Sequence, residues 1–361
     1  MTRTAKPTAA TNVMVAGAGA DADAWARALR GIDGVEVQRL AASTDDELLE
    51  ALSRTGIDAV AFVLPIPDLP NAVKRAVMTR RHVLVAGAVA LSSKQLLALD
   101  DLARRRERVI LFDTGNLADE RLAFVRKMTG GSQALWRPRY VRSLRTGTHG
   151  RASLDDLAMA DIAVVLAIAG GAPSRVSALA PRIDDESGPA DVAMVTLAFD
   201  GGPAARVEVS FVEPGLRQEV VVACDGRSVV LDAFDTRAPL QIQASARHRG
   251  PQRDGQWAET VSEHPMADMG TRLARAADLF VTAVRTKDVA ATNALDLAVA
   301  AQVWETARES MTRGGEMLPL VSASPLARAA RPSLQLIEGG GHRVESAAVP
   351  ELTLISRREP A

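Results

Sequence analysis

The stretch Asn12-Val-Met-Val-Ala16-Gly17-Ala-Gly19-Ala-Asp21-Ala22 sets the pattern of the first third of the chain. Its apolar beginning predicts a short buried strand, and the glycine-rich turn leads into a helical stretch that ends near Arg30. Glycines at positions 17 and 19 allow backbone N–H groups to approach a ligand closely, and the small Ala22 allows tight packing of helix on strand. This layout is typical of a turn that holds a phosphate at a helix N-terminus.

Strands and helices alternate from this turn to about residue 135. Further strands are predicted at 35–40, 58–64, 82–85 and 109–112, with helices at 45–54, 70–79 and 93–106 between them. Strands separated by helices of this length imply a parallel, doubly wound sheet. We therefore expect a flexible N-terminus at 1–11 and an α/β, Rossmann-like dinucleotide-binding domain at 12–135.

The rhythm changes after about Trp136. A long helix at 154–168 is followed by strand-like runs and then by two amphipathic helices. The runs lie at 174–179, 191–199, 205–211, 219–224 and 228–233, and the helices at 272–285 and 294–311. Glycine-containing turns between the runs favour hairpins. We predict an α+β domain at 136–320 with a mostly antiparallel open sheet, followed at 321–361 by a partly disordered tail or a tail strand that pairs with another protomer.

Composition limits the partners of the chain. Its 361 residues include 43 Lys+Arg and 44 Asp+Glu, and the resulting charge of −1 gives no general attraction for nucleic acid or anionic membranes. The single cysteine, Cys224, excludes an internal disulfide framework. We see no signal peptide, no membrane-spanning stretch and no convincing metal-ligand spacing, so we expect a cytoplasmic protein without a bound metal.

The run His82-Val-Leu-Val-Ala-Gly-Ala-Val-Ala-Leu-Ser92 resembles the "HVLCEKPLALS" strand and turn of the Gfo/Idh/MocA oxidoreductase family. The segments 226–232 and 309–315, and the order of predicted elements over 12–320, are similar to the same family. The resemblance implies a Rossmann-like domain, a C-terminal substrate domain and a homodimer or homotetramer. It also places Gly87 where the family has its catalytic lysine.

The stretch from Gly150 to Ala163 resembles the family's catalytic helix, "GGGxLxDxGxHxxD". Asp156 is kept, and Ala160 stands in place of the histidine. Removing an alcohol's proton needs a base of suitable pKa, so losing both lysine and histidine removes the usual acid/base pair. Asp156 is a catalytic candidate or simply a helix-start charge. His149, in the preceding loop, is the other catalytic candidate or an ordinary surface residue.

Three further residues could line the active-site cleft that the resemblance implies. They are Asn116, Tyr140 and Asp161.

One residue argues against phosphate binding at the turn of Gly17 and Gly19. Asp21 lies in the first helical turn, where a carboxylate either repels a phosphate or only caps the helix.

The residues after the second predicted strand bear on cofactor choice. Leu40-Ala-Ala-Ser-Thr-Asp45 lacks the acid that normally binds the ribose of NAD at this position. Ser43, Thr44 and Arg39 can accommodate a 2′-phosphate, which favours NADP over NAD, although Ser43 or Thr44 could equally cap the next helix. The turn at 65–70 matches the family's "TPPSLH" only at Pro67 and Leu69, and the resemblance assigns Pro67 to the nicotinamide side.

Two functions follow. The first is an NAD(P)-dependent oxidoreductase with an atypical active site, acting on a sugar, cyclitol or imine-like small molecule. The second is a catalytically inactive relative that serves as a regulatory or accessory subunit and binds a protein partner. Retention of the whole scaffold favours the first.

Overall fold

The structure is a computed structural model that describes residues 10–41, 45–66, 68–129, 135–147, 152–181, 190–233, 240–246, 258–263 and 272–321. Its N-terminal part is a parallel five-stranded sheet in the order β2-β1-β3-β4-β5. The strands are β1 (Thr11–Ala16), β2 (Val35–Leu40), β3 (Ala59–Val63), β4 (His82–Ala86) and β5 (Ile110–Asp113). The predicted α/β, Rossmann-like fold of this part is therefore confirmed.

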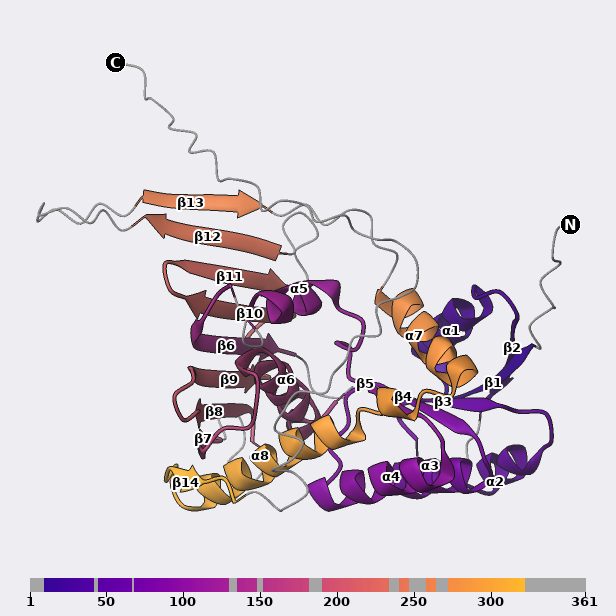
Figure 1. The fold of residues 1–361 in the computed structure, drawn as a ribbon. Coiled ribbons are helices and arrows are strands. Elements are labelled where there is room, and N and C mark those ends of the chain that lie inside the picture. Colours follow the sequence, from indigo (N-terminus) through magenta and orange to yellow (C-terminus); the bar gives the residue numbers. More distant parts are fainter. Residues whose placement is uncertain are drawn as a thin grey trace, which may run out of the picture.

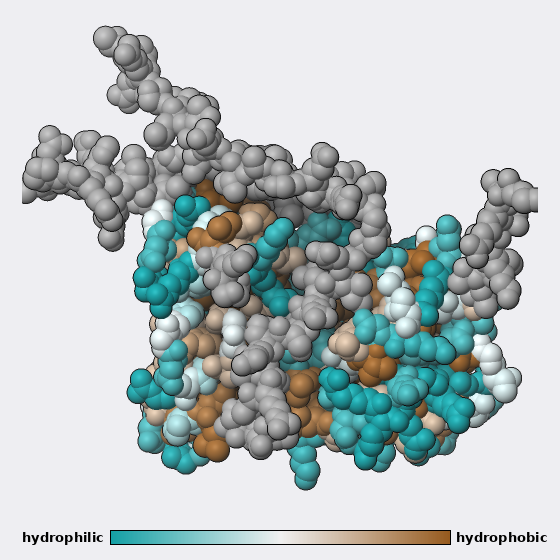
Figure 2. Space-filling view, viewed as in Figure 1, coloured by the Kyte–Doolittle hydropathy of each residue, from teal (hydrophilic) through white to brown (hydrophobic). Residues whose placement is uncertain are grey.

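Helices cover both faces of this sheet (Figure 1). The helices of the N-terminal part are α1 (Gly19–Arg30), α2 (Asp45–Ser53), α3 (Leu69–Met78), α4 (Ser93–Arg106) and α5 (Glu120–Thr129). Alternate residues of each strand face opposite layers, so β1 contributes Val13 and Val15 to one apolar core and Met14 to the other. Figure 2 shows a largely hydrophilic surface over α3 and α4, as expected for amphipathic helices that bury one face.

The two C-terminal helices return to the N-terminal sheet. Helix α7 (Arg272–Thr286) packs against α1, whereas α8 (Ala294–Thr312) packs against α4, α6 and β7. Between them runs the short 3-10 helix η1 (Val289–Ala291), which crosses the open edge of β5. The Thr292 hydroxyl accepts a hydrogen bond from the Ile110 amide at 3.2 Å, and the Asn293 side chain pairs with both backbone groups of Phe112 at 2.8 and 2.9 Å. These side chains satisfy the edge strand in place of a sixth strand.

The C-terminal sheet has nine strands in the order β13-β12-β11-β10-β6-β9-β8-β7-β14. Every pairing is antiparallel except β6 with β9. Its strands are β6 (Pro138–Thr146), β7 (Arg175–Leu179), β8 (Val192–Ala198), β9 (Ala204–Ser210), β10 (Arg217–Cys224), β11 (Arg227–Asp232), β12 (Leu240–Ala246), β13 (Ala258–Glu263) and β14 (Leu318–Pro319). The predicted mostly antiparallel sheet is confirmed.

Helix α6 (Leu154–Ala169) lies on one face of the C-terminal sheet, next to β6 and β9 (Figure 1). Its apolar residues join the same core as the α2–α4 face of the N-terminal sheet. A continuous core therefore links the two sheets through α6 and α8. None of the helices in the described part of the chain is long and apolar enough to cross a membrane.

Candidate functional site

The carboxyl ends of β1, β3, β4 and β5 meet at one edge of the N-terminal sheet, because parallel strands all end on the same side. Gly17 follows β1 there with φ of +145°, and a Cβ at this position would lie 2.5 Å from the carbonyl oxygen of Val63. The neighbouring Gly19 has φ of +75°. Only glycine fits at position 17, so the chain passes as close to β3 as a phosphate-binding turn requires.

Helix α1 begins at this turn without a side-chain cap. Its N-cap residue is Ala18, which has no polar side-chain atom, so Asp21 is not the cap that one interpretation of the sequence assigned to it. Asp21 is exposed in the first turn, and Ala22 is fully buried against the sheet. The amides of the first turn of α1 therefore have no side-chain cap. Free amides at a helix N-terminus can bind an anion.

Arg39 from β2 lies over the same turn. Its guanidinium donates to the carbonyl oxygens of Val15 at 3.3 Å and Gly17 at 3.2 Å, and forms an ion pair with Asp23 at 3.0 Å. The arginine thus holds the end of β2 against the Gly17 turn. Its charge is shared with Asp23, which moderates the positive potential available to a bound phosphate.

The turn after β4 has a backbone conformation that a lysine would rarely adopt. Gly87 has φ of +123°, a conformation that residues with a Cβ rarely adopt, and its amide donates to the carbonyl oxygen of Asp113 at 2.9 Å. A Cβ on Gly87 would meet the Leu64 side chain at 3.2 Å. The turn therefore requires glycine in this conformation.

Asp156 links this turn to the start of α6. Its Oδ1 accepts a hydrogen bond from the Ala90 amide at 2.7 Å, and its Oδ2 accepts from the Ser153 amide at 2.9 Å and the Ser153 hydroxyl at 2.7 Å. The Ser153 hydroxyl in turn accepts from the Asp156 amide at 3.1 Å, which completes a capping box. Both carboxylate oxygens are thus engaged in positioning α6 against the turn.

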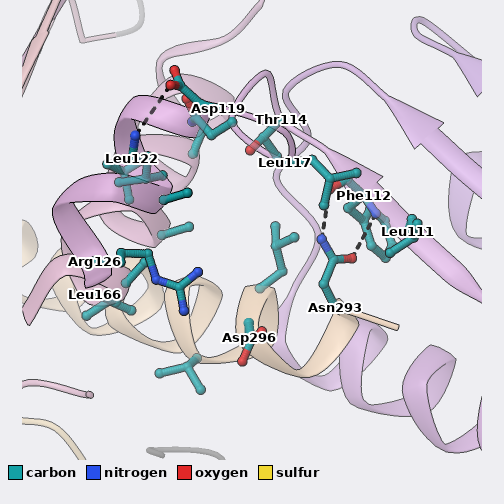
Figure 3. Close-up of a pocket in the computed structure, with 18 of the residues that line it drawn as sticks. Leu111, Phe112, Thr114, Leu117, Asp119, Leu122, Arg126, Leu166, Asn293 and Asp296 are labelled. Atoms are coloured by element: carbon teal, nitrogen blue, oxygen red, sulfur yellow. Dashed lines mark hydrogen bonds between the residues drawn. The ribbon is translucent and has the colours of Figure 1, made fainter. Parts of the chain in front are cut away.

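Ala160 lies one helical turn after Asp156 and is fully buried. Its methyl group lines a cavity of about 140 Å³ where α5, α6 and α8 meet the carboxyl end of β5 (Figure 3). Most of the lining is apolar, and the polar side chains in it belong to Thr114, Asn116, Asp119, Arg126, Asn293 and Asp296. The space beside Ala160 is therefore part of an apolar cavity with a small number of polar groups.

Arg126 and Asp296 point toward each other across this cavity, from α5 and α8 (Figure 3). Burial raises the pKa of Asp296 to about 6, against a smaller opposing effect of Arg126. Burial also lowers the pKa of Arg126. The sequence analysis missed both residues, because each falls in a helix whose surroundings depend on contacts between distant segments.

Asp113 is a second buried acid at the carboxyl end of β5. Burial raises its pKa, while its Oδ1 accepts hydrogen bonds from the amides of Gly115 at 2.9 Å and Leu117 at 3.3 Å. These bonds shape the loop into α5. Asp113 therefore helps to form the wall that carries Thr114 and Asn116.

The remaining sequence candidates divide into three groups. Asn116 lines the cavity, and its buried Nδ2 has no hydrogen-bond partner within the described residues. Asp161 is 1% exposed and pairs with Arg145 between α6 and β6, while Tyr140 is 38% exposed on the opposite face of the sheet. Ser43, Thr44, Pro67 and His149 lie outside the described residues. No group of three or more His, Cys, Asp and Glu side chains in the described part of the chain could hold a metal ion.

The chain combines a parallel five-stranded sheet with a mostly antiparallel nine-stranded sheet, and the cavity lies where α5, α6 and α8 meet the end of β5. The family model of the GFO/IDH/MocA C-terminal domain matches residues 117–230. That match confirms over residues 117–230 the resemblance predicted from the sequence, and the solved structures below share the fold of the chain. A search of curated protein sequences gave no significant match.

Several solved structures share this fold over nearly their full length. GenD2 from gentamicin A biosynthesis, solved with NAD, has a TM-score of 0.69 at 17% identity, covering 89% of this chain and 99% of its own. Levoglucosan dehydrogenase, solved with NADH and L-sorbose, has a TM-score of 0.67 at 14% identity and covers 88% and 100%. UDP-N-acetylglucosamine 3-dehydrogenase GnnA from Acidithiobacillus ferrooxidans has a TM-score of 0.65 at 18% identity and covers 85% and 99%.

Proposed function

We propose that this protein is an NAD(P)-dependent oxidoreductase of the Gfo/Idh/MocA type with an altered active site, acting on a sugar, cyclitol or imine-like small molecule. The observation that carries the proposal is the Gly17 turn, where a positive φ and the 2.5 Å approach to the Val63 carbonyl admit only glycine. In dinucleotide-binding folds a glycine at this place makes the tight turn between the first strand and the helix that holds the pyrophosphate. The similar proteins solved with NAD or NADH support the same cofactor class.

Each residue of the cofactor site has a proposed role. Gly17, Gly19 and the uncapped first turn of α1 would hold the pyrophosphate, with Ala22 giving room for the helix to pack. Ser43 and Thr44 would contact the adenosine ribose or a 2′-phosphate, which keeps NADP favoured over NAD, and Pro67 would lie beside the nicotinamide. When bound, the dinucleotide supplies the hydride acceptor or donor.

Proton transfer in this protein must use residues other than the lysine and histidine of the family. Neither Gly87 nor Ala160 can exchange a proton, and both oxygens of Asp156 already accept hydrogen bonds from Ala90 and Ser153. We therefore assign Asp156 a positioning role and keep His149 as the proposed proton-handling residue. A cytoplasmic location and a homodimer or homotetramer are proposed with this function.

A second function is favoured by the turn after β4. Gly87 occupies a conformation that a lysine would rarely adopt, as expected of a protein that does not use the family's lysine. In this case the protein binds a dinucleotide or metabolite and serves as a regulatory or accessory subunit for a protein partner.

A measurement of catalytic turnover distinguishes the oxidoreductase from the accessory subunit. Purified protein would be incubated with NADP or NAD and a panel of sugars and cyclitols, and with NADPH or NADH and a panel of cyclic imines, while nicotinamide absorbance is followed. The enzyme proposal predicts a substrate-dependent change that His149→Ala slows roughly a hundredfold, as for loss of a general acid or base. Asn71→Ala, on the exposed side of α3, is the control and should leave the rate unchanged. Cofactor binding without any turnover would instead support the accessory subunit.

A further inference from the structure

One polar group in the wall of the cavity between α5, α6 and α8 lacks a hydrogen-bond partner. Asn116 lies in the loop between β5 and α5 and lines the cavity. Its buried Nδ2 donates no hydrogen bond within the part of the chain that the structure describes. A buried amide N–H without an acceptor costs free energy, and a ligand that brings an acceptor removes this cost. The unpaired Nδ2 therefore suits a ligand that carries an accepting oxygen.

The rest of the wall requires a ligand that is mostly apolar. Leucine and alanine side chains from α5, α6 and α8 form much of it, among them Leu122, Leu166 and Leu297 (Figure 3). A sugar or cyclitol carries a hydroxyl on nearly every carbon, and each buried hydroxyl needs a partner that leucine and alanine cannot supply. The cavity therefore suits a molecule with one polar group and not a polyol.

The charged side chains in the wall disfavour a charged ligand. Asp296 and Arg126 both line the cavity, so a ligand anion would meet a carboxylate and a ligand cation would meet a guanidinium. Arg126 already has a partner and is not free to bind a ligand carboxylate. Asp119, the other acid in the described lining, is paired with Arg121 at 2.6 Å. An unbalanced charge in an apolar space costs free energy, so an uncharged ligand fits best.

The size of the cavity limits the ligand to about one six-membered ring. Its volume of about 140 Å³ is close to that of the roughly 150 Å³ cavity that holds benzene in another protein interior. Alanines at 160, 163 and 167 along α6 leave this space. None of the described residues lining the cavity belongs to the Gly17 turn or to 86–88, so this space is distinct from the proposed dinucleotide site.

We propose that this cavity binds a small uncharged alcohol or ketone with an apolar ring or branched body, whose oxygen accepts a hydrogen bond from Asn116 Nδ2. Binding at this site needs neither a dinucleotide nor turnover, so the inference does not rest on the proposed function.

Isothermal titration calorimetry of the full chain tests this proposal with cyclohexanol as the probe, without dinucleotide present. Cyclohexylamine and cyclohexanecarboxylate keep the ring but carry a charge at neutral pH, so each should bind at least about tenfold more weakly than cyclohexanol. Absence of cyclohexanol binding at millimolar concentration, or equal binding of either charged compound, would overturn the proposal. This comparison needs no variant.

Variants locate the bound alcohol and test the role of the amide. Asn116→Leu keeps the size of the side chain but removes the donor. The affinity for cyclohexanol should therefore fall about three- to tenfold, whereas benzene, a ring without an oxygen, should bind at least as well as before. Ala163→Leu fills the cavity and should abolish the binding of both. Asn71→Leu, the same exchange at an exposed position of α3, is the matched control and should leave both affinities unchanged.

Circular dichroism confirms that each variant is folded. Unchanged cyclohexanol affinity in a folded Asn116→Leu or Ala163→Leu variant, or an equal loss of cyclohexanol and benzene binding in Asn116→Leu, would overturn the proposal. NADPH titrations of the same variants report separately on the Gly17 turn.

Discussion

At the scale of single residues, a side chain can match a sequence motif and still have a different role in the structure. The sequence predicts Asp156 as a catalytic candidate, yet its two oxygens accept three hydrogen bonds from Ala90 and Ser153. Sequence spacing places this carboxylate at the start of a helix but cannot show that the turn after β4 supplies a donor to it. The residue therefore fastens α6 to the turn after β4.

Replacing Asp156 with Ala tests this positioning role. We expect the free energy of unfolding to fall by about 1 to 2 kcal/mol, because a capping box and a bond to Ala90 are lost together. Asp155→Ala is the matched control, since Asp155 makes an exposed ion pair with Arg308, at 3.4 Å, and its loss should cost less than about 1 kcal/mol. Chemical denaturation measures both. A fully stable Asp156→Ala variant with abolished turnover would instead make Asp156 catalytic.

His82 gives the protein a built-in acid sensitivity. Burial, helped by Arg108, lowers its pKa from 6.5 to about 4, and its Nδ1 accepts a hydrogen bond from the Val109 amide at 3.1 Å. Because the folded state disfavours protonation, this contribution to stability is complete above pH 6.5 and is lost as the pH falls toward 4. Between pH 7 and 5 the loss is on the order of 2 kcal/mol.

The variant His82→Asn keeps an acceptor for Val109 but cannot titrate. Denaturation curves at pH 7 and pH 5 should therefore show a smaller loss of stability for the variant than for the unaltered chain. An identical pH dependence would show that His82 is not the titrating group.

At the scale of elements, the alternating strands and helices of the first third could be predicted because each buried strand is a short apolar run bounded by turn residues. The boundaries shift by only a residue or so, as for β5, predicted at 109–112 and found at Ile110–Asp113. Helix α5 and strands β12, β13 and β14 were missed. Helix α5 has a weakly segregated apolar face, and β14 is only two residues long. Strand β12 does alternate apolar and polar residues, in Leu240-Gln-Ile-Gln-Ala-Ser-Ala246, and could have been predicted from that pattern.

The candidate site was less predictable than the fold. The glycines at 17 and 19 could be assigned from their motif, since local backbone geometry decides their role. Arg126 and Asp296 could not, because their environment arises from α5 and α8, which lie far apart in the sequence and meet only in the folded chain. Tertiary contacts, rather than local pattern, bring these two charged side chains into the wall of one cavity.

The conformation of the turn after β4 predicts the effect of placing a lysine at position 87. Gly87→Lys places a Cβ in a backbone conformation with φ of +123° and against Leu64, so we expect a loss of roughly 1 to 3 kcal/mol in stability and no gain of activity. Gly170→Lys is the control, because Gly170 ends α6 with φ of +82° and has open space around it. Thermal unfolding should be lowered more at 87 than at 170. An active, stable Gly87→Lys variant would contradict this account of the turn.

At the scale of the whole molecule, the C-terminal helices join the two sheets. Helix α7 packs on α1, α8 packs on both α4 and α6, and the segment between them closes the edge of β5. Residues 272–312 therefore contribute to the core of the N-terminal sheet as well as to that of the C-terminal one.

Asn293→Ala tests the closure of this edge. The variant leaves the buried amide and carbonyl of Phe112 unpaired, so we expect a loss of about 2 to 4 kcal/mol in stability. Hydrogen exchange should speed up at β5 before it does at β1, in the centre of the sheet. Asn71→Ala, exposed on α3, serves as the control and should have little effect. Unchanged exchange at β5 would show that another group closes the edge.

The central claim is that the Gly17 turn still holds a dinucleotide, and titration of the purified chain with NADPH and NADH tests it most directly. We expect nicotinamide fluorescence to report micromolar binding, tighter for NADPH, and we expect Gly17→Ala to abolish it. Gly201→Ala, at another positive-φ glycine with no neighbour within 4 Å, should leave binding intact. Absence of binding by either dinucleotide at millimolar concentration, or equal binding by Gly17→Ala, would contradict the account.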